Sequence, residues 1–155
     1  MGTRGAVAST ASYLLGGPPA TEHHISFRQI LTIPADGARI ALDWELPPLS
    51  KTELSPTTSA KERTKQIVTR GGIQQPVVLV LHGMNNDSSF GYVRSLMRTF
   101  TNRGWVAVGM NFRGCGGIKL ATPRCYNGAY TGDIRGVVQH IESRLAPNVP
   151  IFLVG

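Results

Sequence analysis

The sequence predicts an α/β fold built on a parallel sheet. Three short apolar runs, 77–81, 105–112 and 151–154, have the length and aliphatic character of strands that are buried on both faces. The two stretches between them repeat apolar residues at helical spacing. The order strand, helix, strand, helix, strand makes two right-handed crossover units, so the three strands are expected to run parallel in one sheet.

A β-hairpin is expected ahead of the parallel strands. The β-prone runs 27–33 and 38–44 flank the sequence Pro34-Ala35-Asp36-Gly37. An Asp-Gly pair supplies the positive backbone angles of a tight turn. The hairpin would be antiparallel, which makes the predicted sheet mixed.

The first helix between the parallel strands is expected to begin near Ser88 or Ser89, either of which can cap it, and to end at Gly104. The second is expected to begin near Thr131, with Asp133 in its first turn facing the positive end of the helix dipole, and to stop at Pro147. The apolar stripe of the second helix consists of Ile134, Val137, Val138, Ile141 and Leu145.

The remaining segments are predicted to be irregular. Residues 1–24 have the composition of a disordered leader without a targeting signal. Residues 47–75 are rich in Pro, Ser, Thr and Lys and are expected to form a long polar surface loop. Its basic run Lys61–Arg70 is interpreted as solvated, with a regulatory or lipid-contacting role as the alternative. Residues 25–155 would then form one domain with this loop as an insertion.

Composition narrows the function classes. The chain has 155 residues, 41% hydrophobic and 16% charged, with a net charge of +7. The basic residues are dispersed and aromatic residues are 7%, which argues against nucleic-acid binding. The acid-free stretch 88–132 is interpreted as a solvated basic face, with a membrane-surface or acidic-partner patch as the alternative. The longest aliphatic run, 77–81, is too short to span a membrane, so a cytoplasmic or membrane-associated protein is expected.

Cysteine and histidine usage predicts neither a metal nor a cofactor. Cys115 and Cys125 match no zinc spacing and are interpreted as reduced thiols. The pair His23-His24 lacks a third spaced ligand, and His140 is expected on a helix surface.

The carboxyl ends of the predicted strands are the expected place for function. After the first parallel strand comes His82-Gly83-Met84. A glycine here lets the backbone approach a bound carbonyl, and the Met84 amide can then point at an oxyanion. The alternative is a plain strand-to-helix turn in which His82 bonds to neighbouring backbone.

After the second parallel strand comes Arg113-Gly114-Cys115-Gly116-Gly117. Its glycines lack the spacing of a dinucleotide or P-loop motif, so a structural turn is predicted rather than a phosphate site. Cys115 as a nucleophile is disfavoured, because no base stands beside it in the sequence. Asp133 is interpreted as a helix cap rather than a catalytic acid.

Taken together, these motifs resemble the α/β-hydrolases, and within them the AB hydrolase 4 family. The resemblance covers residues 27–155, outside the stretch 50–75. It rests on Asp36-Gly37, Leu42-Asp43-Trp44, the run Pro76–Gly83, Tyr92-Val93-Arg94, the run Asn111–Gly117, Pro123-Arg124, Tyr126, the run Thr131–Ile134 and the run Phe152–Gly155.

The resemblance implies the N-terminal half of an α/β-hydrolase fold, truncated at the nucleophile elbow. The family's elbow G-x-S-x-G would begin at Gly155, and no serine of the chain has glycines two places before and after it. His82, Gly83 and Met84 would form half of the oxyanion hole. Catalytic serine, acid and histidine are expected beyond this residue, so the 155-residue chain itself is expected to be inactive.

The implied function is that of a serine ester hydrolase acting on carboxylic esters or acylglycerols, with acyl transfer to alcohols as a related reaction. Its partner would be a small-molecule acyl ester or lipid, with neither nucleic acid nor cofactor. Peripheral membrane contact and the oligomeric state are left open. The alternative is a non-catalytic short isoform that acts as a binding or regulatory module.

Overall fold

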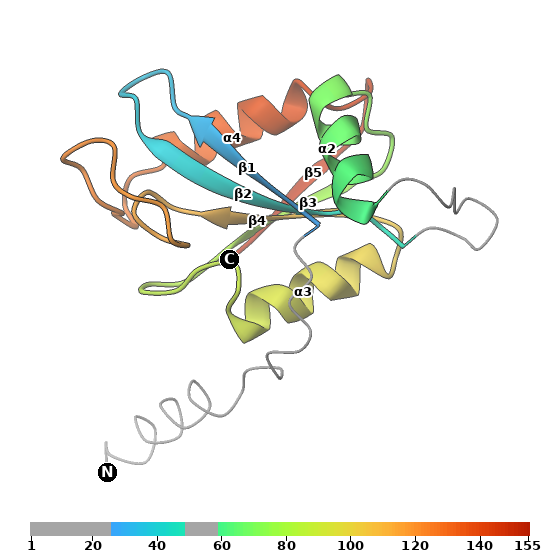
Figure 1. Cartoon of the computed structure of the whole chain (residues 1–155), viewed down its shortest axis with the longest axis horizontal. Coiled ribbons are helices and arrows are strands. Elements are labelled where there is room, and N and C mark those ends of the chain that lie inside the picture. Colours follow the sequence, from blue (N-terminus) through green and yellow to red (C-terminus); the bar gives the residue numbers. More distant parts are fainter. Residues whose placement is uncertain (1–25, 49–58) are drawn as a thin grey trace, which may run out of the picture.

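The computed structural model describes residues 26–48 and 59–155. The predicted leader therefore lies outside the described residues. The described part contains a five-stranded mixed sheet of order β1-β2-β4-β3-β5 (Figure 1). Strand β2 pairs antiparallel with both β1 and β4, and β3 pairs parallel with both β4 and β5. The strands are β1 Phe27–Thr32, β2 Arg39–Glu45, β3 Val77–Leu81, β4 Val106–Asn111 and β5 Ile151–Val154. The helices are α2 Ala60–Arg70, α3 Gly91–Thr101 and α4 Gly132–Glu142.

The predicted hairpin is confirmed. Strands β1 and β2 pair from Phe27 opposite Trp44 to Thr32 opposite Arg39. The Ile33 amide donates to the Ala38 carbonyl at 2.8 Å, and Gly37 takes a φ of 75°. This left-handed backbone is the reason for glycine in the turn.

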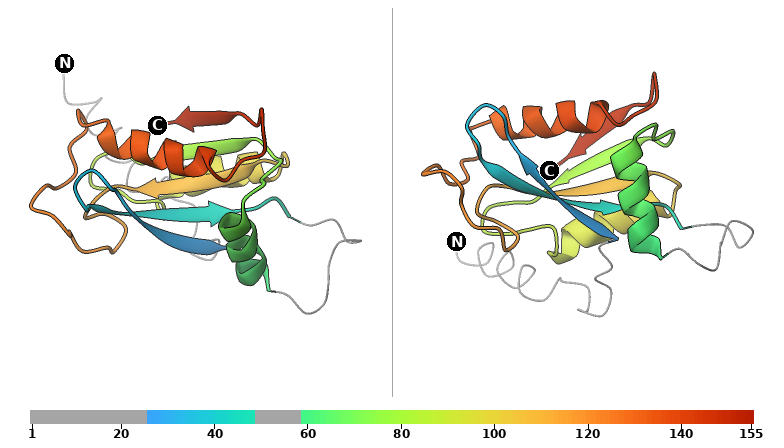
Figure 2. Two further views of the ribbon diagram at one scale, coloured as in Figure 1. Left: turned by 90° about the horizontal axis from the view of Figure 1, so that it is seen from above. Right: turned by 45° about the horizontal axis from the view of Figure 1, so that its top comes forward.

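The apolar strands divide the core into two layers. Alternate residues of β3 face opposite sides, so Val77 and Leu79 join one cluster and Val78 and Val80 the other. Helices α2 and α4 cover the first side and α3 covers the second (Figures 1 and 2). The predicted apolar stripe of α4 packs as expected, with Val137 and Ile141 fully buried.

The expected loop over 47–75 is wrong for its second half, which contains α2. The Ser59 hydroxyl caps this helix by accepting a hydrogen bond from the Glu62 amide at 3.2 Å. Thr64 and Val68 are buried against the sheet, one helical turn apart. Because most other residues of this helix are polar, the spacing of these two did not stand out as an amphipathic helix in the sequence. Lys61, Lys65 and Arg70 are exposed, as the interpretation of a solvated basic run expected.

Strand β5 is less buried than predicted. Its position at the edge of the sheet leaves Phe152 45% and Leu153 48% exposed. Phe152 packs on the Trp105 ring with centroids 4.9 Å apart. The apolar composition of this strand is that of a strand covered on both faces, whereas the described residues cover it only in part.

Two further expectations around α3 are corrected. Its N-cap position is Phe90, with no side-chain cap bond, and Ser88 is turned into the interior instead. Arg94 was expected on the solvated basic face, yet it is 5% exposed and forms an ion pair with Glu45 of β2. A paired charge tolerates burial where an isolated one does not. No helix among the described residues is long and apolar enough to cross a membrane.

His140 is half-buried rather than on the surface as predicted, with its Nε2 3.1 Å from the Gln29 Oε1 atom of β1. Burial, and then the nearby Arg144, lower the pKa of His140 below its usual value of 6.5. The folded state therefore binds a proton less readily than the unfolded chain.

We expect the free energy of unfolding to decrease as the pH falls below about 6.5, because protonation of His140 favours the unfolded chain. The variant His140→Gln should lose that part of the pH dependence. Urea unfolding of both proteins between neutral pH and pH of about 5 measures it. Parallel pH profiles would contradict the assignment.

Candidate active-site edge of the sheet

The three parallel strands end side by side at one edge of the sheet. Leu81 of β3 is paired with Met110 of β4, and Val80 with Val154 of β5. A Cβ atom on Gly155 would lie 3.0 Å from the Leu81 Cβ atom, so the residue that follows β5 lies next to the end of β3. The sequence His82-Gly83-Met84, the turn at 113–117 and Gly155 therefore meet at this edge.

His82 holds the loop after β3 through both ring nitrogens. Its Nε2 atom accepts a hydrogen bond from the Phe112 amide at 3.3 Å, so the ring proton resides on Nδ1, which donates to the Gly83 carbonyl at 2.7 Å. The ring is 4% exposed and packs edge-on against Phe112. His82 is thus a positioning residue for the loop after β3.

The Met84 amide lies at the first central position of a tight turn. The Asn86 amide closes this turn on the Gly83 carbonyl at 3.3 Å, and Asn85 takes a φ of 59°, which asparagine tolerates better than most residues. Such a turn does not use the amide of its first central residue. Within the described part of the chain the Met84 N–H has no acceptor, whereas the Gly83 amide donates to the Tyr92 hydroxyl at 2.5 Å.

A buried carboxylate lies beneath the loop after β3. Asp43 of β2 is fully buried and accepts two hydrogen bonds from Arg28, Nε to Oδ1 at 2.6 Å and Nη2 to Oδ2 at 2.7 Å. The same Oδ2 accepts from the Ser88 hydroxyl and, at 2.8 Å, from the Asn111 side-chain amide. The bond to Asp43 raises the pKa of the Arg28 guanidinium. These four residues, the Asp43 network, join β1, β2, β4 and the loop before α3.

The glycine-rich turn is fitted against this network. The Arg28 Nη1 atom donates to the Gly116 carbonyl at 2.7 Å. Gly116 has a φ of 63°, and a Cβ atom there would overlap the Asn111 side chain. The Asn111 Oδ1 atom is meanwhile held by the Ser88 amide at 2.8 Å. Gly116 is therefore required both by its backbone angle and by lack of space.

Arg113 and Asp133 form a second buried ion pair, which revises the interpretation of Asp133 as a helix cap. The Arg113 Nε atom donates to the Asp133 Oδ2 atom at 2.8 Å, and Nη2 binds the other carboxylate oxygen. The Arg113 Nη1 atom binds Asp36 of the hairpin turn at 2.9 Å, and its guanidinium lies over the Tyr130 ring. These partners raise the pKa of Arg113 and lower the pKa of Asp36.

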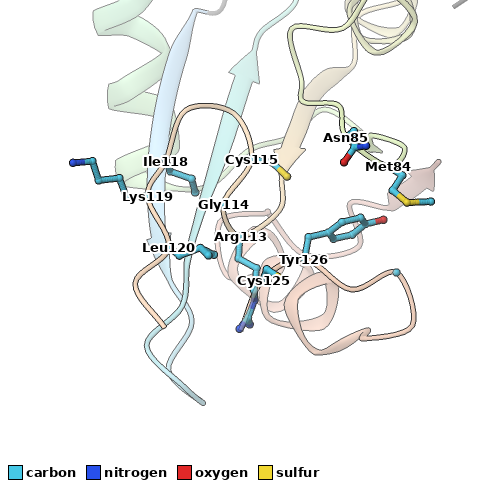
Figure 3. A pocket seen from close by; sticks show the side chains of 11 residues that line it. Met84, Asn85, Arg113, Gly114, Cys115, Ile118, Lys119, Leu120, Cys125 and Tyr126 are labelled. Carbon is cyan, nitrogen blue, oxygen red and sulfur yellow. The ribbon is translucent and has the colours of Figure 1, made fainter. Parts of the chain in front are cut away.

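An open pocket of about 660 Å³ lies between the loop after β3 and residues 113–128 (Figure 3). Its wall contains Met84 together with Gly114 and Cys115 of the predicted turn. Cys115 and Cys125 both line it as free thiols. Burial, and then the charge of Asp87, raise the pKa of Cys115, which keeps the thiol protonated and argues further against a nucleophile. No group of metal-ligating side chains was found among the described residues.

Four residues that matter to this edge were not singled out as site residues from the sequence: Asp43, Ser88, Tyr92 and Asn111. The motifs contained three of them, but their partners are far apart along the chain. None of these four residues has a local sequence pattern that would have identified it. By contrast, the turn after Met84 could have been predicted from the pair Asn85-Asn86, because asparagine commonly adopts left-handed backbone in turns.

Together, the mixed sheet and this edge define an α/β-hydrolase-like fold. A solved structure described as an alpha-beta serine hydrolase homologue from Coxiella burnetii matches 81% of the chain and 49% of its own length, with a TM-score of 0.46 and 17% identity. No family model matches the chain.

Curated relatives identify the branch. Phospholipase ABHD3 from Bos taurus is 30% identical over 131 residues, which is 84% of this chain and 28% of the relative. Embryogenesis-associated protein EMB8 from Picea glauca is 31% identical over 83 residues, 54% of this chain and 18% of the relative. The monoacylglycerol lipase of Saccharomyces cerevisiae is 34% identical over 82 residues, 52% of this chain and 18% of the relative.

The resemblance drawn from the motifs is thereby confirmed: this is an α/β-hydrolase sequence of the AB hydrolase 4 type. The chain spans between 18% and 28% of the length of these curated relatives. One of the three is named as a phospholipase, one as a monoacylglycerol lipase and one as an embryogenesis-associated protein.

Removal of the Asp43 carboxylate should destabilise the whole domain. Asp43→Ala leaves Arg28, Ser88 and Asn111 without their common acceptor, so we expect the free energy of unfolding to decrease by about 3 kcal/mol. Glu142→Ala, at an exposed site, is the control and should change it by less than about 0.5 kcal/mol. Equal effects in chemical unfolding would refute a special role for Asp43.

Substitution of two neighbouring glycines distinguishes the cost of a positive backbone angle from the cost of a steric overlap. Gly117→Ala meets only the cost of a φ of 79°, with nothing within 4 Å of the new Cβ, and should cost about 1–2 kcal/mol. Gly116→Ala adds the overlap with Asn111 and should lower the melting temperature clearly further. Thermal unfolding of both variants tests this, and equal melting temperatures would contradict it.

Proposed function

We propose that this chain is part of a serine ester hydrolase that acts on carboxylic esters or acylglycerols, with acyl transfer to alcohols as a related reaction. The observation that carries the proposal is the unused Met84 amide in the turn after β3, the strand whose last residue, Leu81, lies next to Gly155. The lipase and phospholipase names of the relatives support the ester class.

In the proposed reaction, a serine that follows Gly155 attacks the ester carbonyl and the carbonyl oxygen becomes an oxyanion. The Met84 N–H donates to this oxygen, and the amide after the nucleophile is the second donor. His82 and Gly83 position the turn, and Tyr92 holds the Gly83 amide. The serine's proton passes to a histidine beyond Gly155, which gives it to the alcohol as the ester bond breaks and the acyl-enzyme forms. Water then attacks the acyl-enzyme and gives a proton to the same histidine, which returns it to the serine as the acyl–serine bond breaks and the carboxylic acid is released.

In the proposal, no residue in the ranges 26–48 and 59–155 takes the part of nucleophile, base or catalytic acid. The His82 ring is committed to the Phe112 amide and the Gly83 carbonyl, and Asp133 is committed to Arg113. The proposal therefore assigns residues 1–155 the oxyanion-binding part without serine-dependent turnover. Peripheral membrane contact remains a prediction, and the exposed basic residues of α2 would be the part of the chain that makes it. The proposal assigns no oligomeric state.

The first test is to read the transcript and genomic DNA past the codon for Gly155. The proposal expects x-Ser-x-Gly to follow in frame, with an acid and a histidine further on. The polypeptide so encoded should then react with a fluorophosphonate probe, whereas residues 1–155 alone should not. Labelling of the 155-residue chain would refute its inactivity. A stop codon directly after Gly155 in a mature transcript would favour the non-catalytic binding or regulatory module.

The second test addresses the Met84 amide in the extended polypeptide. Met84→Pro removes only this N–H donor, and proline suits the first central position of such a turn. We expect kcat for an aryl ester to fall by about 10²–10³-fold, while Met84→Ala retains activity because it keeps the amide. Equal activities of the two variants, with unchanged circular dichroism, would remove Met84 from the oxyanion hole.

A further inference from the structure

The long loop between β4 and α4, residues 112–131, contains a pair of residues with a chemistry of its own. The loop projects from one end of the sheet (Figure 1), and its residues Tyr126 and Gly128 line the pocket beside Met84. The proposed reaction gives no task to this part of the loop. Asn127-Gly128 is the one place in the chain where an asparagine precedes a glycine.

An asparagine followed by a glycine can lose its side-chain amide in an intramolecular reaction. The main-chain nitrogen of the glycine attacks the side-chain carbonyl carbon of the asparagine. This attack needs a backbone that can rotate freely and an unobstructed approach, and glycine provides both because it has no Cβ atom. A β-branched residue in the same position is stiff and bulky next to the attacking nitrogen. The reaction is therefore expected only where the local structure leaves both groups accessible.

The local structure leaves the reacting groups of Asn127 and Gly128 accessible. Both residues are exposed. Within the part of the chain that the structure describes, no acceptor takes a hydrogen bond from the Gly128 N–H or from the Asn127 Nδ2 atom. The Asn127 Oδ1 atom accepts one from the Ala129 amide at 2.9 Å. This bond closes an Asx turn across Gly128, and it polarises the carbonyl carbon that the Gly128 nitrogen would attack.

Other asparagines lack one or more of these features. Asn111 is fully buried, and its side chain is held by the Ser88 amide and by Asp43. Asn148 is exposed and has a φ of 65°, but Val149 follows it. Asn148 therefore has the exposure of Asn127 without the glycine, which makes it an internal control.

We propose that Asn127 is a site of spontaneous deamidation, and that the isoaspartate formed there reshapes the wall of the pocket beside Met84. The Gly128 nitrogen loses its proton to solvent and forms a bond to the Asn127 Cγ atom, and the Cγ–Nδ2 bond breaks with release of ammonia. Water then opens the resulting cyclic imide. Cleavage of the bond from Cγ to the Gly128 nitrogen gives aspartate, and cleavage of the original main-chain bond gives isoaspartate.

Isoaspartate changes the pocket wall because the main chain then runs through the former side chain and is one methylene group longer. The turn that the Tyr130 amide closes on the Asn127 carbonyl at 3.0 Å cannot keep its present geometry. A pocket residue or its neighbour is attached on each side of this turn. The Tyr126 ring rests on Phe112 with centroids 4.5 Å apart, and the Tyr130 ring lies beneath the Arg113 guanidinium.

The modification itself is tested in the 155-residue protein. The protein is kept at neutral pH and physiological temperature, and its peptides are analysed by mass spectrometry at intervals. The expected result is progressive loss of the amide at Asn127, with isoaspartate as the major product and with Asn148 intact. An enzyme that methylates isoaspartyl carboxyl groups distinguishes isoaspartate from aspartate. An intact Asn127, or equal amide loss at Asn148, would overturn the proposal.

Gly128→Ala is the matched variant. The φ of Gly128 lies outside the left-handed region, and a Cβ atom there would meet only the Tyr126 hydroxyl, at 3.5 Å, so the fold should be retained. The variant keeps Asn127 and its exposure but obstructs the attacking nitrogen. We expect most of the amide loss at Asn127 to disappear. Undiminished loss in a variant with unchanged circular dichroism would overturn the assigned chemistry.

Cys115 reports on the pocket wall, because it lines the pocket as a half-buried free thiol. Its alkylation by iodoacetamide is measured in fresh protein, in the chromatographically separated isoaspartate form and in fresh Asn127→Asp. The expected result is faster alkylation in the isoaspartate form alone, because Asn127→Asp keeps both the backbone and the acceptor for the Ala129 amide. An unchanged rate in the isoaspartate form, or the same increase in Asn127→Asp, would overturn the reshaping. These measurements need no serine beyond Gly155 and are independent of the proposed function.

Discussion

The buried carboxylate of Asp43 is the interaction on which the rest of this structure depends. A fully buried charge is tolerated only where it is paired and its oxygens are hydrogen-bonded. Arg28, Ser88 and Asn111 meet this demand, and they come from β1, the loop before α3 and β4. The antiparallel hairpin, the parallel sheet and the loop that follows β3 are thereby held in one arrangement.

The hairpin supplies the acids for three arginines. Asp36, Asp43 and Glu45 pair with Arg113, Arg28 and Arg94 respectively. Two of these arginines, Arg94 and Arg113, come from the acid-free stretch 88–132. A part of the chain's basic excess is therefore internal and compensated from the hairpin, rather than displayed to an anionic partner.

These pairs have consequences at the edge of the sheet where the parallel strands end. Arg113 is neutralised by its two carboxylates, so the pocket next to it is mainly apolar. The Met84 amide in the turn above the pocket is left without an acceptor among the described residues. An unused amide donor beside a mainly apolar space is compatible with the ester substrate that we propose, because the carbonyl of an ester accepts hydrogen bonds.

Local sequence patterns were enough to predict the strands, the hairpin turn, the helices α3 and α4 and the His82-Gly83-Met84 turn, because each follows from a pattern within a few residues. They did not reveal α2, since only Val68 and a few neighbours carry an apolar signal there. Tertiary structure alone decided that Ser88 is a ligand of Asp43 instead of a cap, and that Arg94 and Arg113 are buried. Their partners lie 45, 49 and 77 residues away along the chain. Charge pairing over such separations depends on how the sheet brings strands together, which local periodicity does not encode.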